Sequence, residues 1–256
     1  MVYIAIGFGL LLMLSIFFSI FNFDDVHVMA QESDWLAIGN QLKAAGDYKG
    51  AVAAVDKALQ INPNSKEAWL SRGDALNSQG NYTGAIAAID KALQIDPNYK
   101  DAWYFRGRAL NGQGNYTGAI AAIDKALQID PNYRDALDGK GIALNSLGNY
   151  SQAITYFDKA LKVDPNYVYS LNNKGFALVR LGNYSLAIPY FDKAFQLNAK
   201  FLDPLLLKGE AQYSLGNYTG SKSTFQKVLQ VDPTNQRAKS KIDQLNFVLN
   251  STLSKK

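Results

Sequence analysis

Apolar residues recur along this chain at the three- and four-residue spacing of amphipathic helices. Ala85, Ile89 and Leu93 share one face of a predicted helix, and Trp69 and Leu76 share a face of the helix before it. The same pattern returns every 34 residues. A fixed period of this size indicates a stacked repeat architecture, in which each unit packs mainly on its neighbours. The sequence therefore predicts successive pairs of helices.

Turn residues delimit each predicted pair. Gly80-Asn81 breaks the first helix, and the side-chain oxygen of Asn81 is suited to cap the second. Asp96-Pro97 ends the second helix, because the residue before a proline is disfavoured in the helical conformation. The segment GNYTGAIAAIDKALQIDPNY, residues 80–99, recurs unchanged at 114–133. Small residues at the predicted helix crossing permit close approach, and a large Trp or Leu fills the remaining space.

The repeated positions resemble those of the tetratricopeptide repeat family over residues 32–235. The fourth position of each unit is Trp or Leu, the eighth is Gly, and the twentieth and twenty-seventh are small or medium-sized. The thirty-second is proline in every unit except the fifth, which has Ala199. The resemblance implies an all-α fold, a right-handed superhelical solenoid of six helix-turn-helix repeats: 32–65, 66–99, 100–133, 134–167, 168–201 and 202–235.

The first 23 residues form a separate hydrophobic segment. Val2–Phe21 contains no charged residue, and a helix of this length reaches about 30 Å, the thickness of a bilayer core. One interpretation is an uncleaved signal anchor; the other is a secretory signal cleaved after Val28-Met29-Ala30. The length and the missing basic n-region favour the anchor. We expect repeats outside the cytoplasm, membrane-anchored, or secreted if the leader is removed.

Two further segments flank the repeats. Residues 24–31 are interpreted as a linker. Residues 236–256 are predicted to form a capping helix followed by a basic tail, with Ala238, Ile242, Leu245 and Leu249 on its apolar face. Such a helix would cover the apolar side of the last repeat, as terminal elements do in repeat proteins.

Composition excludes several kinds of chemistry. The chain has no cysteine and one histidine, so no thiolate site or histidine cluster is available. No nucleophile–base pair, glycine-rich phosphate loop or metal-ligand spacing is present. The net charge of +4 is spread along the chain, and no nucleic-acid partner is expected. We therefore expect no enzyme activity, cofactor or metal.

The resemblance implies that a partner peptide or helix binds in a concave groove lined by the first helix of each repeat. Groove positions recur at fixed places in each unit, and the equivalent Asn77, Asn111 and Asn145 suggest a ladder for peptide backbone. The alternative is that these are ordinary polar residues on exposed helix faces. The predicted groove residues are Asp74, Asn77, Tyr104, Arg108, Asn111, Asp138, Asn145, Asn172, Phe176 and Arg180. Some members of the family bind a C-terminal carboxylate through Lys, Asn and Arg at fixed groove positions. This sequence does not reproduce that set.

A second feature is a row of cations at the seventh position of five repeats, called the basic stripe here. Such a row could hold an acidic polymer. The competing and favoured interpretation is that the aliphatic stems pack between helices and the charged heads meet water. The stripe consists of Arg72, Arg106, Lys140, Lys174 and Lys208.

Asparagines at the start of the second helices stand in acceptor sequences for N-glycosylation. Duplicated helix caps are the favoured explanation, and sugars the alternative. The sites are Asn81, Asn115, Asn149, Asn183, Asn217 and, near the C-terminus, Asn250. The tyrosine after each of the first five is assigned to core packing.

Our first hypothesis is a non-catalytic scaffold for protein–protein interaction, anchored by its N-terminal helix or exported, which binds a peptide or helix in the groove. The alternatives are an envelope component that assembles with copies of itself, and a module that binds an acidic polymer or glycan through the basic stripe.

Overall fold

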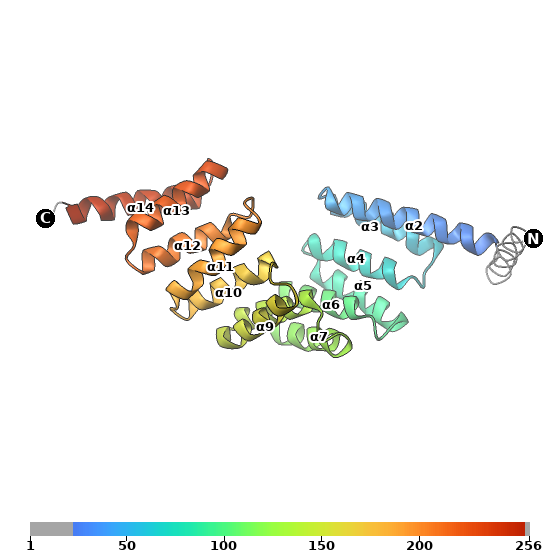
Figure 1. Ribbon diagram of the computed structural model, residues 1–256. Coiled ribbons are helices and arrows are strands. Elements are labelled where there is room, and N and C mark those ends of the chain that lie inside the picture. Colours follow the sequence, from blue (N-terminus) through green and yellow to red (C-terminus); the bar gives the residue numbers. More distant parts are fainter. Residues whose placement is uncertain (1–22, 254–256) are drawn as a thin grey trace, which may run out of the picture. The chain divides into compact units, whose positions relative to one another are not determined.

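The computed structural model describes residues 23–253 (Figure 1). Within this range the chain forms thirteen helices and no strand, which confirms the predicted all-α class. It divides into two compact units, one ending at Gln113 and the other beginning at Gly114. The predicted leader helix at 2–21 lies outside the described residues. Of the helices in residues 23–253, none has the length and apolar character needed to span a bilayer.

The first unit contains five described helices. Consecutive helices pack on one another, and the first helices of successive repeats, α2, α4 and α6, also contact each other. They thus form one layer, with α3 and α5 behind it. The helices are α2 (Phe23–Ala44), α3 (Tyr48–Ile61), α4 (Lys66–Ser78), α5 (Tyr82–Ile95) and α6 (Lys100–Gly112).

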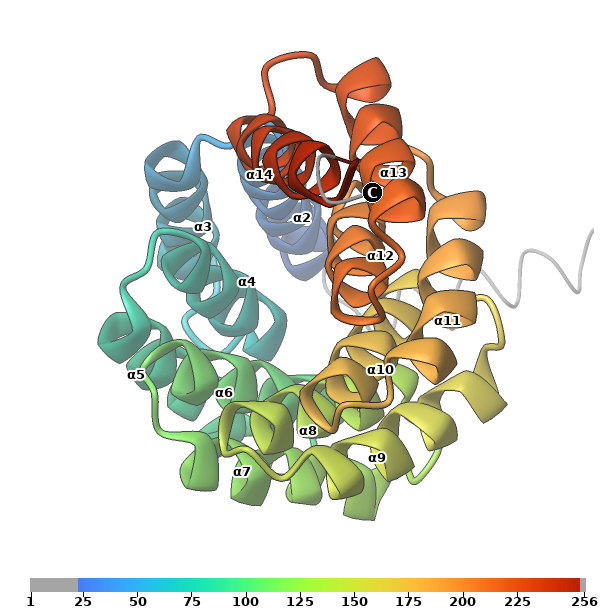
Figure 2. The same cartoon turned by 90° about the vertical axis from the view of Figure 1, so that its left-hand side faces the viewer.

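The second unit follows the same rule with eight helices. First helices α8, α10 and α12 contact one another. In Figure 2, α10 and α12 lie on the inner side of this unit, whereas α9 and α11 lie on its outer side. The helices are α7 (Tyr116–Ile129), α8 (Arg134–Ser146), α9 (Tyr150–Val163), α10 (Val168–Arg180), α11 (Tyr184–Leu197), α12 (Asp203–Ser214), α13 (Tyr218–Val231) and α14 (Gln236–Leu253).

The segment interpreted as a linker, residues 24–31, is helical instead. It forms the first turns of α2, which begins at Phe23 and continues into the first repeat. The segment contains neither glycine nor proline, so nothing in it interrupts a helix that extends backwards from the repeat.

Within each unit, glycines at the helix crossings provide the close approach expected from the sequence. A methyl group added to Gly141 would lie 2.4 Å from the Phe157 ring, and one added to Gly175 would lie 2.5 Å from the Phe191 ring. Both rings are fully buried. The ring of the second helix therefore occupies the space that a side chain on the first helix would need, and this packing holds each hairpin together.

The large residue at the fourth position joins one repeat to the preceding one. The indole nitrogen of Trp69 donates to the carbonyl of Pro63 at 2.9 Å, and Trp103 donates to Pro97 at the same distance. Trp35 has no such proline before it and is 37 % exposed. Trp69 and Trp103, which have such a turn before them, are half-buried.

The C-terminal helix α14 caps the array as predicted. Ala238 and Leu245 are buried in a cluster with Leu205, Phe225 and Val228 of the last repeat. Ile242 packs against the same cluster. This helix removes apolar surface of the last hairpin from water.

The second helices differ in how they begin. The Asn115 side chain accepts a hydrogen bond from the backbone nitrogen of Gly118 at 2.9 Å, as the cap interpretation expects. Asn149 has no such bond. A Cβ atom at Gly118 would lie 2.7 Å from the Asn115 amide, and Gln152 occupies the equivalent place after Asn149. The cap therefore depends on glycine three residues later.

This difference yields a matched test. Asn115→Ala should lower the free energy of unfolding by about 1 kcal/mol, because it removes a cap hydrogen bond. Asn149→Ala, which removes the same side chain without a bond, should have a clearly smaller effect. Urea unfolding followed by circular dichroism measures both. Equal losses would show that the bond contributes nothing.

Candidate protein-interaction groove

In the first unit, the predicted groove residues join an ion-pair network across three first helices. Asp74 on α4 accepts a hydrogen bond from Lys43 on α2 at 2.5 Å and one from Arg108 on α6 at 3.4 Å. The Arg108 guanidinium also lies over the rings of Phe105 and Tyr104, at 4.9 and 5.9 Å from their centroids. The charged groups of this unit are therefore largely engaged with each other.

The three equivalent asparagines share an unusual property. The side-chain oxygens of Asn77, Asn111 and Asn145 are buried and accept no hydrogen bond within the described part of the chain. Buried polar groups are nearly always paired, and leaving one unpaired costs about 1–3 kcal/mol. The asparagine ladder suggested by the sequence is thus a row of side-chain oxygens that accept no hydrogen bond from the described part of the chain.

The second unit contains a hollow of about 470 Å³ between α8, α10 and α12. Asn172 belongs to it, is only 8 % exposed, and also has a side-chain oxygen without a hydrogen bond. Four predicted groove residues, all in this unit, come together here. The hollow is lined by Ile142, Asn145, Ser146, Tyr150, Asn172, Asn173, Phe176, Arg180 and Leu207.

Arg180 carries the charge of this hollow. Its Nε donates to the Tyr150 hydroxyl at 3.1 Å, and its guanidinium lies 5.3 Å from the centroid of the Tyr150 ring. Among the described residues no carboxylate pairs with it, in contrast to Arg108 in the first unit. The tyrosine holds the cation in place and leaves its charge uncompensated.

Sequence analysis missed part of this site. Tyr150 was assigned to core packing, yet its hydroxyl also accepts from Arg180. Ile142 and Leu207 stand at groove positions, the ninth and sixth of their repeats, but were not among the predicted groove residues. The position rule that selected Phe176 would have found them.

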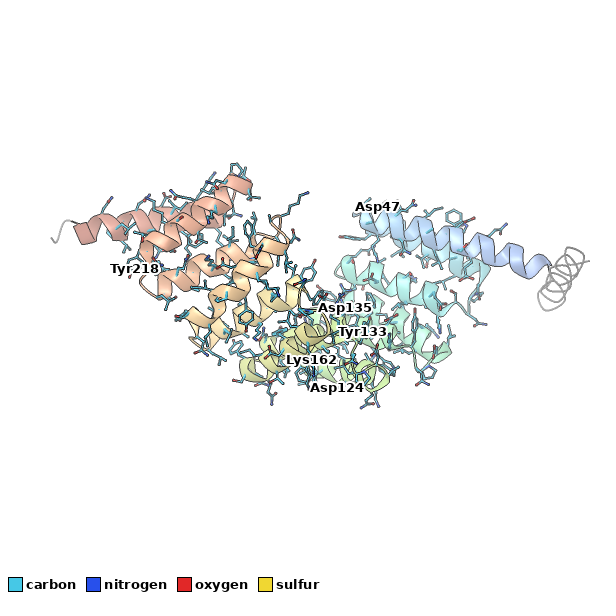
Figure 3. The ribbon with its side chains drawn as sticks, viewed as in Figure 1. Asp47, Asp124, Tyr133, Asp135, Lys162 and Tyr218 are labelled. Atoms are coloured by element: carbon cyan, nitrogen blue, oxygen red, sulfur yellow. The ribbon has the colours of Figure 1, made fainter. Side chains whose placement is uncertain are left out.

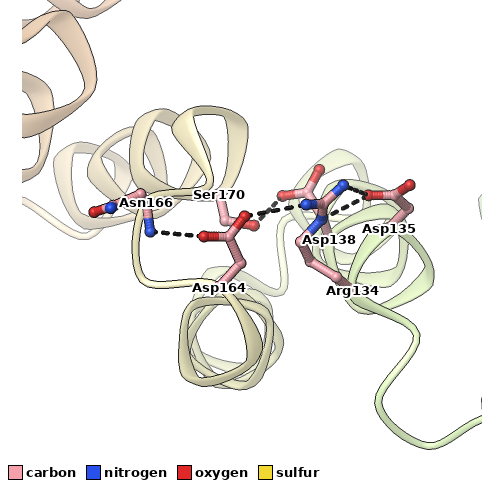
Figure 4. A network of polar contacts seen from close by, with 6 residues as sticks. All are labelled: Arg134, Asp135, Asp138, Asp164, Asn166 and Ser170. Atoms are coloured by element: carbon pink, nitrogen blue, oxygen red, sulfur yellow. Dashed lines mark hydrogen bonds and ion pairs between the residues drawn. The ribbon is translucent and has the colours of Figure 1, made fainter. Parts of the chain in front are cut away.

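Asp138, predicted as a groove residue, lies beneath the surface instead. It is 4 % exposed and accepts a hydrogen bond from Ser170 at 2.6 Å (Figure 4). It accepts a second one from Asn173 at 3.4 Å. Burial raises the pKa of Asp138 to about 6, although both hydrogen bonds act in the opposite direction. Because Asn173 lines the hollow, Asp138 holds a groove residue and is not itself a contact surface.

Arg134 forms a second contact between the same two repeats. It pairs with Asp164 at 3.0 Å and with Asp135 at 2.9 Å (Figure 4). Its guanidinium also lies 4.1 Å from the centroid of the Tyr167 ring. These partners fix the start of α8 against the turn that leads into α10. Two sets of polar contacts therefore join the fourth repeat to the turn and helix that follow it, one made by Asp138 and the other by Arg134.

The basic stripe is not a row of unpaired cations. Each member forms an ion pair with an aspartate sixteen residues earlier, on the second helix of the preceding repeat, at 2.5 to 2.8 Å. The recurring sixteen-residue separation in the sequence could have revealed this. The stripe therefore links repeats, and its charge is offset; its partners are Asp56, Asp90, Asp124, Asp158 and Asp192.

Asp138 gives the fold a defined pH dependence. Its pKa is about 6 in the folded chain against an ordinary value of 3.8, so the folded state retains a proton that the unfolded state loses. The free energy of unfolding should therefore decrease as pH rises from about 4 to about 6, by roughly 3 kcal/mol from this group. Asp138→Asn should remove that decrease, and urea unfolding at several pH values measures it.

Asp203→Asn, which removes one exposed carboxylate at the start of α12, is the control. The difference between the curves of the native chain and the Asp138 variant isolates this carboxyl from other groups that titrate in the range. If the difference in free energy of unfolding between the native chain and Asp138→Asn did not change between pH 4 and pH 6, the raised pKa of the buried Asp138 carboxyl would be contradicted.

Comparison with known proteins agrees with this architecture. Models of the tetratricopeptide repeat match residues 36–100, 76–137 with 178–245, 139–167 and 156–188. No curated protein sequence matches the chain.

Solved structures share the fold at low identity. PilW, described as a widely conserved type IV pilus biogenesis factor, is 23 % identical over 82 % of this chain and 97 % of its own, with a TM-score of 0.74. YrrB, a tetratricopeptide repeat protein with an unusual peptide-binding site, is 22 % identical over 72 % and 95 %, with a TM-score of 0.55.

A chain of the APC/C hetero-tetramer Cut9–Hcn1 is 17 % identical, with a TM-score of 0.75; the match covers 84 % of this chain but only 42 % of that one. These likenesses concern the fold, whereas the family models identify the repeat itself. The chain belongs to the tetratricopeptide repeat family, whose repeats serve as scaffolds for protein–protein interaction.

Proposed function

We propose that this protein binds an extended segment of a partner protein in the hollow between α8, α10 and α12, and that Arg180 pairs with a carboxylate of that segment. The observation that carries the proposal is the coincidence of one uncompensated cation with buried, unused amide oxygens in a single hollow. Cation and acceptors are the complement of an acidic peptide.

The amide groups suit the backbone of an extended chain. Asn145 and Asn172 offer side-chain oxygens that accept no hydrogen bond, and a peptide N–H would supply the missing donor. Side-chain amides that bond main-chain groups provide affinity without regard to sequence, while pockets for side chains supply specificity. Filling these acceptors would remove the cost of leaving them buried and unpaired.

The apolar residues of the hollow suit a large side chain of the segment. Phe176 and Leu207 stand on adjacent first helices, with Ile142 on the third. An aromatic residue of the partner would bury apolar surface against them and anchor the segment. We therefore expect a partner motif that combines one aromatic and one acidic residue.

Binding at the membrane surface forms a further part of the proposal. The leader Val2–Phe21 has the length and apolar character of an anchor, which would tether the chain to a bilayer. Mass measurement of the mature N-terminus together with carbonate extraction of membranes tests this. A chain that begins after Ala30, or one that is released by carbonate, would contradict anchoring.

Short peptides test the groove directly. An acetylated and amidated peptide, Ala-Glu-Ala-Phe-Ala, should bind the full chain at least tenfold more tightly than its glutamine counterpart, because a charge-assisted hydrogen bond contributes about 1.5–3 kcal/mol. Arg180→Ala should abolish this preference, and Asn172→Ala should weaken both peptides. Isothermal titration calorimetry gives the affinities.

Arg108→Ala is the matched control, because Arg108 already pairs with Asp74 and Lys43 would remain as the partner of that aspartate. It should leave the preference for glutamate unchanged. Equal binding of the two peptides by the native chain, or an equal loss in the two arginine variants, would refute the assignment of Arg180.

A further inference from the structure

Two tryptophans of the first unit occupy equivalent places on the repeat, where an indole ring meets a proline carbonyl and an apolar surface. Trp69 and Trp103 each donate their indole N–H to the carbonyl of the proline six residues earlier, Pro63 and Pro97, at 2.9 Å. Their rings also pack against Ala92 and its apolar neighbours on the second helix. The repeat thus provides both an apolar surface and a carbonyl acceptor for an indole.

In the fourth repeat this place is not filled by the chain itself. Leu137 stands where the earlier repeats have tryptophan, and a hollow of about 520 Å³ lies beside it. That volume is within the usual range of small-ligand pockets. The hollow shares no residue with the groove and is lined by Pro131, Asn132, Leu137, Lys159, Lys162 and Val163.

The carbonyl at this hollow lacks a side-chain donor. Pro63 and Pro97 accept from tryptophan, and Pro165 accepts from Lys193 at 2.7 Å. Within the described residues no side chain donates to Pro131, the equivalent of these three. The acceptor that an indole uses in repeats two and three therefore has no side-chain donor at this hollow.

The rim of the hollow carries two cations. In the second repeat Lys91 donates to Gln94 at 3.3 Å. In the fourth repeat Lys162, which Figure 3 labels, takes the place of that glutamine, three residues after Lys159. Neither lysine pairs with a carboxylate in the described part of the chain, although Lys159 lies 4.7 Å from the centroid of the Tyr156 ring. The rim would attract negative charge.

We propose that this hollow binds the tryptophan side chain of an acidic segment of a partner protein. The indole occupies the place that Trp69 and Trp103 fill in their own repeats and donates to the carbonyl of Pro131. Acidic residues beside the tryptophan pair with Lys159 and Lys162. The site is separate from the groove between α8, α10 and α12, so it stands whether or not that groove binds peptide.

The probe is an acetylated and amidated peptide, Gly-Asp-Trp-Asp-Gly, titrated into the full chain while the methyl resonances of Leu137 are followed by NMR. Replacing its tryptophan with 1-methyltryptophan, which lacks the indole donor, should weaken binding at least tenfold. Leu137→Trp should abolish binding, because the chain then fills its own site as in repeats two and three. Its melting temperature should equal or exceed that of the native chain.

Lys162→Gln, which restores the residue found in repeats two and three, tests the charge. It should reduce the preference for this peptide over Gly-Lys-Trp-Lys-Gly by at least threefold while the Leu137 resonances still respond.

Equal binding of the methylated peptide overturns the proposal, and this comparison needs no variant to fold. Undiminished binding to folded Leu137→Trp also overturns it, and tighter binding of free indole-3-acetate than of the peptide overturns the partner assignment.

Discussion

Packing of each helical hairpin on the next is the constraint on which this structure depends. One hairpin is too small to bury its own apolar face, so its stability comes from the interface with its neighbour. Gly175 against Phe191 brings the two helices of a hairpin together, and Trp69 against the turn at Pro63 joins successive hairpins. Arg72 and its equivalents add an ion pair at the same interface.

Repetition of this interface explains where function is expected. Positions that serve the stacking must recur in every unit, so a departure from the repeat marks a place where another requirement acts. Arg180 replaces the small residue found at its position in the other repeats, and Asn172 replaces the leucine of the first two and last repeats. Leu137 with Lys162 is a second such departure. Arg180 and Asn172 line one hollow of the second unit, and Leu137 and Lys162 line another.

The two units place their groove carboxylates differently. Asp74 in the first unit is enclosed by Lys43 and Arg108, so the network satisfies itself. In the second unit the carboxylate of Asp138 is buried and bonded to Ser170 and Asn173, which leaves Arg180 without an acid. The first arrangement holds three first helices together by ion pairs, whereas the second leaves the positive charge of Arg180 without a carboxylate partner among the described residues.

Much of the fold was predictable because helix period, turn glycines and prolines act locally. The cap of Asn115 and the crossing at Gly141 follow from residues close in sequence. The burial of Asp138 was not predictable, since it depends on Ser170 and Asn173, which the next repeat brings against it. The pairing of the basic stripe was visible as a sixteen-residue separation, but charge alone suggested an open surface. The prediction of a linker at residues 24–31 was wrong because no glycine or proline separates this segment from the first helix of the first repeat.

Hydrogen–deuterium exchange of the full chain with and without the peptide Ala-Glu-Ala-Phe-Ala tests the central claim most directly. If the inner wall of the second unit is the binding surface, added protection should be confined to α8, α10 and α12. Protection located instead on α9, α11 and α13, or the absence of any change at a saturating peptide concentration, would contradict the account.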